Sequence, residues 1–317
     1  MTVFVIVNMH DLFAIVMLMS IYGLLSASFF LLMDAVDVAL TEAAVGIVIS
    51  PLLVLSTLSL TGRYEKKIRQ KPVLAVVVVV LTGFLLIYGT LEMPPFGSAS
   101  APVHQHVASY YINESYQETG VANLVSSVLA SYRGYDTMGE LFVIFTAGIG
   151  VLALLGIKTR SNGGAPGAGL PLPMSRHHIL RIVSKMLIPL ILLFALYVQF
   201  HGDFGPGGGF QAGAIFASAM ILFTMIFGLR AVLKVVSRAW LEFLSAMGVL
   251  LYGGTGLVSL ISGENFLDYK VLAQEPTQGQ HLGILLVELG VGITVASIIL
   301  LIFISFTGQL STTEEAP

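Results

Sequence analysis

The chain has 317 residues, of which 56% are hydrophobic and only 10% are charged, and its mean hydropathy is +0.90. Soluble proteins of this size carry about 25% charged residues, so the composition favours an integral membrane protein. The net charge of -3, without a basic patch that alternates with aromatic residues, argues against a nucleic-acid partner. Because the chain has no cysteine, disulfides, iron–sulfur clusters and thiolate metal sites are excluded.

The spacing of apolar residues predicts the membrane spans. A spanning helix needs roughly 20 apolar residues to cross a hydrocarbon core of about 30 Å. Eight segments qualify: 11–33, 37–61, 73–92, 137–157, 182–201, 210–229, 239–261 and 282–305. Residues 1–10 are too few to cross the membrane alone, and we interpret them as a short stub or as the remnant of a helix. Their sequence, MTVFVIVNMH, lacks the features of a cleaved signal peptide. We therefore expect an all-α, polytopic membrane helix bundle with eight spans, or nine if an N-terminal helix is completed.

Lysine and arginine predict the orientation of this bundle. Segments 62–71 and 158–185 hold five each and segment 230–238 holds three, so the eight spans place thirteen of the fifteen on one side. Arg133 and Lys270 fall on the other side. Cytoplasmic loops carry the excess of positive charge, so both termini are expected in the cytoplasm.

The connecting segments predict the domain organisation. The inner stretch 158–175 is rich in Gly and Pro and is typical of a linker between two four-helix halves. We expect a first membrane domain over 1–157, a linker over 158–180, a second membrane domain over 181–310 and a tail over 311–317.

One helix is expected in the long outer segment 93–136. Apolar residues recur at helical spacing within 120–132 and indicate an amphipathic helix that covers the outer mouth of the bundle or contacts a partner. These residues are Val121, Leu124, Val125, Val128 and Leu129.

The outer loop VQFHGDFGPGGGFQAG, 198–213, raises the question of a binding site. A phosphate-binding loop would need a lysine after its last glycine, and a metal site would need more ligands than His201 and Asp203 supply. We interpret the loop as a structural turn, in which Pro206 sets the turn and Gly207, Gly208 and Gly209 allow the chain to re-enter the membrane.

The helix that follows this loop carries small residues on one face. Gly209, Gly213 and Ala217 recur every four residues, a spacing that lets another helix approach closely in lipid. The alternative is that the exposed N–H groups of Gly208 to Phe210 attract an ion or a carboxylate, with His201 and Asp203 at the rim.

Acidic residues near the outer ends of the spans are candidates for an ion or proton path. Asp34 and Asp37 fit the turn between the first two spans, and Glu42, Glu140 and Glu288 lie roughly 6 to 10 Å inside theirs at a rise of about 1.5 Å per residue. The alternative is that each glutamate is protonated or paired and only holds helices together. A lysine or arginine in the middle of a span would supply the cationic partner that a self-contained pump needs, and none is present. The chain is therefore expected to be part of a larger multisubunit complex.

Two further features concern helix geometry at the membrane. Pro51 cannot donate a hydrogen bond to the carbonyl of Ile47, and Gly46 adds looseness, so a kink is expected there. Glu242 follows Arg238 by four residues and is expected to form an ion pair at the cytoplasmic edge.

Three stretches of the chain resemble one transporter family. DAVDVALTEAAVGIVIS (34–50) is similar to the MbhD-type segment in the C-terminal part of MrpA, and YINESYQETGVANLVSSVLASYRGYDTMGELFVIFTAG (111–148) to the MbhE-type segment that follows it. LYVQFHGDFGPGGGFQAG (196–213), together with HLGILLVELGVGITV (281–295), resembles MrpB, also called MnhB. The chain thus resembles the tail of MrpA fused to MrpB. The MbhD pattern normally has one more helix before DLFAIVMLMS, and Ser50-Pro51 stands where many relatives have Ser-Thr.

The resemblance implies a subunit of an Mrp-type Na⁺/H⁺ antiporter in the bacterial plasma (inner) membrane. It implies Na⁺ and H⁺ as transported ions, no cofactor, and as partners the lipid bilayer and MrpA-, MrpC-, MrpD-, MrpE-, MrpF- and MrpG-like subunits. In that family the acids that match Asp37, Glu42 and Glu140 belong to helices proposed to line an ion or proton path. The MrpB part is regarded mainly as an assembly module.

Three functions therefore remain open. The chain is a non-pumping antiporter subunit with part of an ion path, a purely structural scaffold, or a membrane module of a redox complex, because related modules occur in membrane-bound hydrogenases and in the NuoJ-type subunit of complex I. A stand-alone enzyme is not expected, because no nucleophile–base pair or metal-ligand cluster is present; His104 and His106 are interpreted as surface residues.

Overall fold

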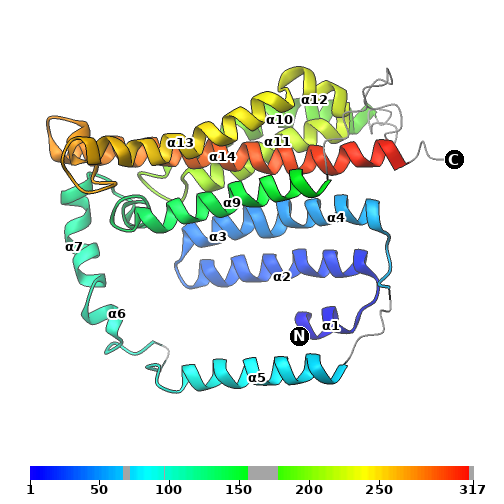
Figure 1. Ribbon diagram of the computed structural model, residues 1–317, viewed down its shortest axis with the longest axis horizontal. Helices are drawn as coiled ribbons and strands as arrows, with labels where there is room; N and C mark the ends of the chain where they lie inside the picture. Colours follow the sequence, from blue (N-terminus) through cyan, green and yellow to red (C-terminus); the bar gives the residue numbers. More distant parts are fainter. Residues whose placement is uncertain (67–71, 96, 156–177, 314–317) are drawn as a thin grey trace.

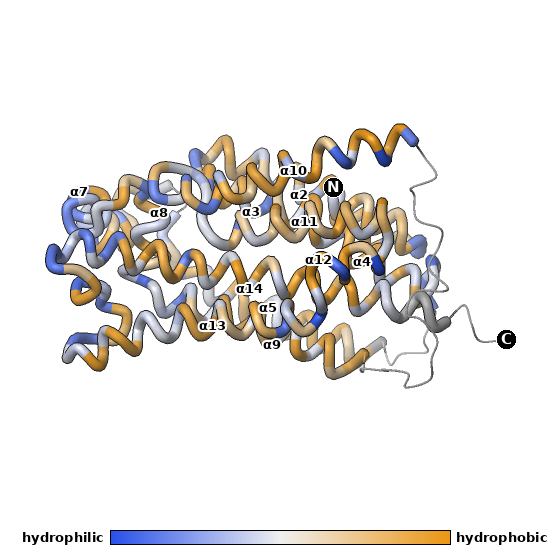
Figure 2. Tube along the Cα trace, turned by 90° about the horizontal axis from the view of Figure 1, so that it is seen from above, coloured by the Kyte–Doolittle hydropathy of each residue, from blue (hydrophilic) through white to orange (hydrophobic). Residues whose placement is uncertain are grey.

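A computed structural model describes residues 1–66, 72–95, 97–155 and 178–313, which form a helical bundle (Figure 1). Eight helices in these ranges are long and apolar enough to cross a membrane, which confirms the predicted all-α fold and its eight spans. They are α2 (Leu12–Leu32), the continuous run of α3 (Val36–Glu42), η1 (Ala43–Ile49) and α4 (Ser50–Thr61), α5 (Pro72–Thr90), α9 (Gly134–Leu155), α10 (His178–His201), α11 (Gly209–Phe227), α13 (Arg238–Ile261) and α14 (Pro276–Thr313). Hydrophilic residues gather at the two ends of the bundle and hydrophobic residues along its middle (Figure 2).

Shorter helices connect the spans. They are α1 (Thr2–Asn8), α6 (Pro102–Gln105), α7 (Ala108–Thr119), α8 (Leu124–Ser127), η2 (Val128–Tyr132), α12 (Leu229–Val235) and η4 (Tyr269–Leu272). The predicted linker 158–175 lies outside the described residues, so its role as a domain boundary stays a prediction. The cytoplasmic orientation of the termini also stays a prediction.

Helix α14 is the centre of the C-terminal half. It packs against α9, α11 and α13, and glycines at these contacts allow the close approach. Gly290 lies against the backbone of Gly248 on α13, and a Cβ on Gly213 of α11 would come 2.7 Å from the carbonyl oxygen of Gly292. The row of small residues on α11 is therefore a packing face, with Ala217 fully buried.

The second span contains a π-helical segment where the sequence predicts a kink. Segment η1 runs from Ala43 to Ile49 and ends two residues before Pro51. The N–H of Ser50 bonds to the carbonyl oxygen of Val45, five residues back. Because Pro51 has no N–H, one ordinary helical hydrogen bond is missing here, and the wider π-helical turn lies beside this gap.

The predicted helix over 120–132 is wrong in its start, and most of its apolar residues do not face the interior of the chain. Gly120 adopts the left-handed conformation (φ +73°) that ends α7, and the next helix begins only at Leu124. Its inward face carries Ser126 and Ser127, whereas Leu124 and Leu129 are exposed. The physical reason is non-local: Ser126 donates a 2.7 Å hydrogen bond to the carbonyl oxygen of Gly202 in a distant loop.

Helix α5 stands apart from the bundle. Figure 1 shows it separated from α2 and joined to the rest through α6 and α7, and it makes no extensive contact with another described helix. None of its spanning residues is buried within the chain. Its whole apolar surface is therefore available to lipid or to other membrane proteins.

Candidate ion-path site

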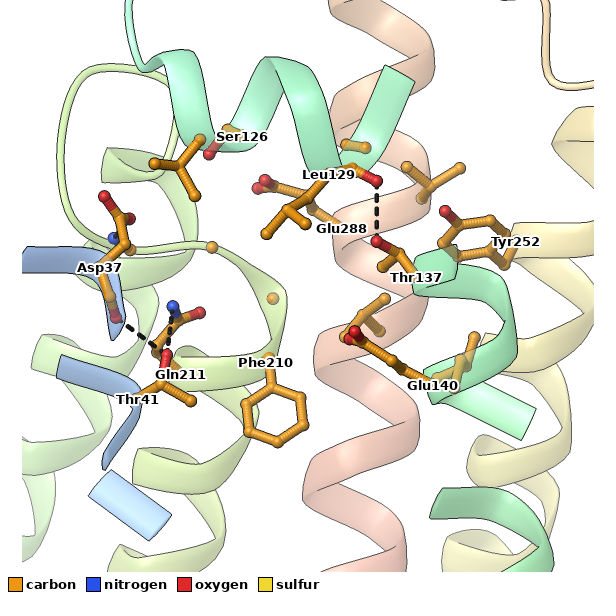
Figure 3. A pocket seen from close by; sticks show the side chains of 18 of the residues that line it. Asp37, Thr41, Ser126, Leu129, Thr137, Glu140, Phe210, Gln211, Tyr252 and Glu288 are labelled. Atoms are coloured by element: carbon orange, nitrogen blue, oxygen red, sulfur yellow. Dashed lines mark hydrogen bonds between the residues drawn. The ribbon is translucent and has the colours of Figure 1, made fainter. Parts of the chain in front are cut away.

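A cavity of about 260 Å³ lies at the predicted outer end of the bundle. Its polar lining comes from helices that are far apart in the chain (Figure 3). Asp37 and Thr41 come from α3, Ser126 and Glu140 from α8 and α9, Gln211 from α11 and Glu288 from α14. Three of the acids that the sequence singles out, Asp37, Glu140 and Glu288, thus line one cavity.

Asp37 is held by the loop between α10 and α11 (residues 202–208, the glycine loop) and by Asn123, the residue before α8. Its Oδ1 accepts hydrogen bonds of 3.3 Å from Asn123 Nδ2 and 3.3 Å from the backbone N–H of Gly207. Thr41 Oγ1 donates to the Asp37 carbonyl oxygen (2.9 Å), and Gln211 Nε2 donates to Thr41 Oγ1 (2.9 Å). These bonds join α3 to α11 across the wall of the cavity.

Glu288 lies against the glycine loop. A Cβ on Gly202 would come 3.2 Å from its Oε2, and a Cβ on Gly208 would come 3.3 Å from its Oε1. A side chain at Gly202 would also come 2.8 Å from the backbone of Gly208, and Gly208 has a positive φ of +113°, so both positions favour glycine. The hydroxyl of Ser126 lies near Glu288, and the neighbouring charges that act on it are Asp203 and Asp37.

Glu140 lies across the cavity from Asp37, next to Tyr252 and Thr137 (Figure 3). The turn that leads into α9 is fixed by buried tyrosines. Tyr252 donates a 2.7 Å hydrogen bond to the carbonyl oxygen of Gly134, and Tyr269 donates a 2.9 Å hydrogen bond to that of Ala130. Because α9 starts at Gly134, these bonds set where Glu140 enters the cavity.

The loop between α10 and α11 is built mainly from its own backbone and Asn123. The Asn123 side chain donates to the carbonyl oxygens of Gly202 (3.0 Å) and Gly205 (2.8 Å). A Cβ on Gly207 would come 2.5 Å from the carbonyl oxygen of Val198, so this position requires glycine. Pro206 lies in the turn and is partly exposed.

Gly207, Gly208 and Gly209 line the cavity, whereas His201, Asp34 and Glu42 lie outside it. His201 stacks on the ring of Tyr197 with centroids 4.8 Å apart. Asp34 is exposed and adopts a positive φ of +61° in the turn before α3. Glu42 folds over its own helix at Gly46 and faces Gly23 of α2. The structure therefore brings Asp37, Glu140 and Glu288 together and leaves Glu42 at a helix contact.

Several residues of the site are not predicted from the sequence. Gln211 and Tyr252 are polar residues within largely apolar helices, and Thr41 lies next to Glu42 on α3. Ser126 lines the cavity and Asn123 bonds to Asp37, in a segment whose apolar spacing draws attention to other residues. Among the described residues, no group of three or more histidines or acids is arranged to hold a metal ion.

Comparison with known families decides the relationship of the chain. The family MnhB, described as "Domain related to MnhB subunit of Na+/H+ antiporter", matches residues 179–301. A Staphylococcus aureus (strain Newman) protein named as putative antiporter subunit mnhB2 is 35% identical over 136 residues, which cover 42% of this chain and 96% of that protein. The chain belongs to the MnhB family.

The rest of this MnhB-family chain matches two further families of MBH subunits. The MbhD family matches residues 1–63 and the MbhE family matches residues 72–162. A Rhizobium meliloti (strain 1021) protein, named as the probable A/B subunit of a K(+)/H(+) antiporter, is 26% identical over 314 residues, 90% of this chain and 31% of that protein. The predicted resemblance to the C-terminal part of MrpA fused to MrpB is confirmed.

Two solved structures resemble the MnhB-family chain. A chain of the Mrp complex from Dietzia sp. DQ12-45-1b matches with a TM-score of 0.75 and 26% identity, over 100% of this chain and 34% of that one. A chain of the membrane-bound sulfane sulfur reductase, an archaeal respiratory membrane complex, matches with a TM-score of 0.52 and 27% identity, over 72% of this chain and 96% of that one. The chain thus spans about a third of the Rhizobium relative and of the Mrp chain.

Proposed function

We propose that this MnhB-family chain is a non-pumping subunit of a multisubunit cation/proton antiporter in the bacterial plasma membrane, and that its cavity forms part of an ion or proton path. The observation that carries the proposal is the meeting of Asp37, Glu140 and Glu288 in one cavity. Each comes from a stretch that matches a different family. Acidic residues within membrane spans are costly and mark ion or proton routes.

The charge of the cavity supports a non-pumping role. Three acids and no lysine or arginine are among its described lining residues. A proton pump needs cationic partners that change the pKa of its acids during the cycle. Here the compensating charge would come from the transported cation or from other subunits, so the chain acts as part of a transporter rather than as an enzyme.

The surface of α5 supports assembly with other Mrp-type subunits. This helix is apolar on all sides and lies apart from the bundle, with Gly83 and Gly89 facing open space. Association in lipid depends on close packing at small residues. Helices of partner subunits would complete the layer between α2 and α5.

The test replaces each acid in the complete antiporter complex and measures cation/proton exchange in membrane vesicles. Glu288→Gln, Glu140→Gln and Asp37→Asn should each lower the exchange rate at least about tenfold, since a positioned proton-transfer group contributes about 10²-fold or more. Glu242→Gln is the matched control, because Glu242 pairs with Arg238 at 2.8 Å and lines no part of this cavity. Co-purification of the other subunits verifies assembly.

The purely structural role makes the opposite prediction. If all three variants assemble and exchange ions at the wild-type rate, the cavity is not part of a path. The chain would then act as a scaffold that holds neighbouring subunits in place.

A redox complex is a second candidate function, favoured by the likeness to a chain of an archaeal sulfane sulfur reductase. The chain has no cysteine to bind an iron–sulfur cluster, so the redox centres would lie in partner subunits. Purification of the tagged chain distinguishes the two: co-purifying iron–sulfur proteins with cluster absorbance indicate a redox complex, and their absence favours the antiporter.

A further inference from the structure

A histidine and an aspartate form a polar pair beside the cavity. His281, near the start of α14, places its Nε2 2.9 Å from Oδ2 of Asp203 in the loop between α10 and α11. The side chain of His281 is 46% exposed, whereas that of Asp203 is 10% exposed. The pair therefore leads from the solvent-accessible surface into the interior.

The second carboxylate oxygen of Asp203 is a free acceptor inside the protein. Oδ1 is buried and has no hydrogen-bond partner in the described part of the chain. The backbone at this residue is fixed, because its carbonyl oxygen accepts a 2.9 Å hydrogen bond from the N–H of Asn123. An unpaired buried carboxylate oxygen costs free energy, and that cost falls when the oxygen binds a proton or a water molecule.

Glu288 lies further along the same line. It follows His281 by seven residues, close to two helical turns, so both side chains share one face of α14 with Glu288 about 10 Å deeper. Its carboxylate lies against Gly202, the residue before Asp203. The groups that face this line are Asp203 from the loop and Asp37 from α3.

We propose that His281 and Asp203 are a proton-relay pair that exchanges protons between solvent and Glu288. The relay rests on the proposed function, in which Glu288 belongs to the path. It gives the MnhB part a share in proton movement in addition to assembly.

The proton balance follows from the geometry. The imidazole of His281 binds a proton from solvent at Nδ1 and passes the proton on Nε2 to Oδ2 of Asp203, which leaves a neutral imidazole and a neutral carboxylic acid. Asp203 then gives this proton to the carboxylate of Glu288, through water where the two groups are not in contact, and regains its negative charge. A flip of the imidazole ring restores the starting tautomer.

The test measures exchange by the complete complex in vesicles, with and without added imidazole. His281→Gln keeps an N–H donor for Asp203 but carries no titrating proton. We expect the exchange rate to fall at least about tenfold and imidazole, a diffusible proton carrier, to restore most of it. His104→Gln changes an exposed histidine of the segment before α7 and is the control, with wild-type exchange in both conditions.

Two further variants separate the possible outcomes. Asp203→Asn removes the proton acceptor, so its exchange should be slow and insensitive to imidazole, as should that of Glu288→Gln. Wild-type exchange by His281→Gln or Asp203→Asn overturns the relay, as does a slow His281→Gln variant that imidazole does not restore. Wild-type exchange by Glu288→Gln overturns the proposed function itself. Should His281→Gln fail to assemble, the Asp203→Asn result decides.

Discussion

The hydroxyl of Tyr252 on α13 and the carbonyl oxygen of Gly134, the first residue of α9, are joined by a buried hydrogen bond of 2.7 Å. Tyr252 is fully buried, and Gly134 is buried as well. Two helices that are far apart in the sequence are thereby fixed relative to each other at the edge of the cavity, six residues before Glu140.

Replacing Tyr252 by Phe should destabilise this junction. The ring still fits, but the hydrogen bond to Gly134 is lost. The carbonyl oxygen of Gly134 keeps its helical donor because this residue begins α9, so the expected cost is that of one buried hydrogen bond, about 0.5–1.5 kcal/mol. We expect a lower thermal unfolding temperature for the purified complex. Tyr135→Phe, at an exposed ring, should leave that temperature unchanged; equal effects of the two substitutions would argue against the role of the bond.

Replacing Gly213 by Ala should force α11 and α14 apart. The new Cβ would come 2.7 Å from the carbonyl oxygen of Gly292 and 2.9 Å from Cβ of Val295, and backbone atoms cannot rotate away. Overpacking of this kind costs about 1–3 kcal/mol. Gly254→Ala on α13 is the control because nothing lies within 4 Å of its Cβ. Denaturation of the purified complex should be easier for the first variant only.

Glu42 offers a test of packing against transport. In Gly46→Ala the new Cβ would come 2.5 Å from Oε1 of Glu42, so the flexible carboxylate must move away from its helix. Carbodiimide labelling of Glu42, followed by mass spectrometry, should increase relative to the wild type and to Gly83→Ala. Because Glu42 is not among the lining residues of the cavity, Glu42→Gln should slow exchange less than Glu288→Gln. A larger effect at Glu42 would move the path to the contact between α2 and η1.

The outer segment should respond to acid through Glu118. Its carboxylate accepts hydrogen bonds from Tyr110 (2.6 Å) and Tyr132 (2.5 Å), and these bonds lower the pKa of Glu118 below its usual range. A carboxyl whose pKa is lowered by folding contributes stability above its unfolded pKa of about 4.3. That stability is lost as the pH falls through the lower pKa of the folded state.

Proteolysis of this segment measures the effect. The cleavage rate within α7 should be constant from neutral pH down to about pH 5 and should rise in more acidic solution, after correction for the activity of the protease. Glu118→Gln should be cleaved faster at neutral pH and show little further change. A wild-type rate that follows that of Glu118→Gln at every pH would contradict the prediction.

The spans were predictable because the requirement for about 20 apolar residues is local and strong. The helix at 120–132 was not, because its orientation depends on hydrogen bonds between Ser126 and a loop that lies 76 residues further along the chain. The π-helical form of η1 was likewise not predictable from the sequence, since Pro51 indicates only that an ordinary helical hydrogen bond is missing.

The acids of the site were predictable as individual residues, because charge inside a span is costly. Which of them meet was not predictable. Asp37 and Glu42 lie five residues apart on α3, about 140° apart around the helix axis, so only one of them reaches the cavity. The pairing of His281 with Asp203 joins the start of α14 to a distant loop and depends on the close approach of α11 to α14.

The walls of the cavity come from stretches that match three separate families, yet here they share one polypeptide. Tethered partners meet at an effective concentration of about millimolar, so a substitution that loosens one wall does not allow it to diffuse away. Mutations where these walls meet should therefore produce leaky or slow complexes with unchanged subunit stoichiometry. In a relative whose segments are separate chains, the same changes would cause one subunit to dissociate from the complex.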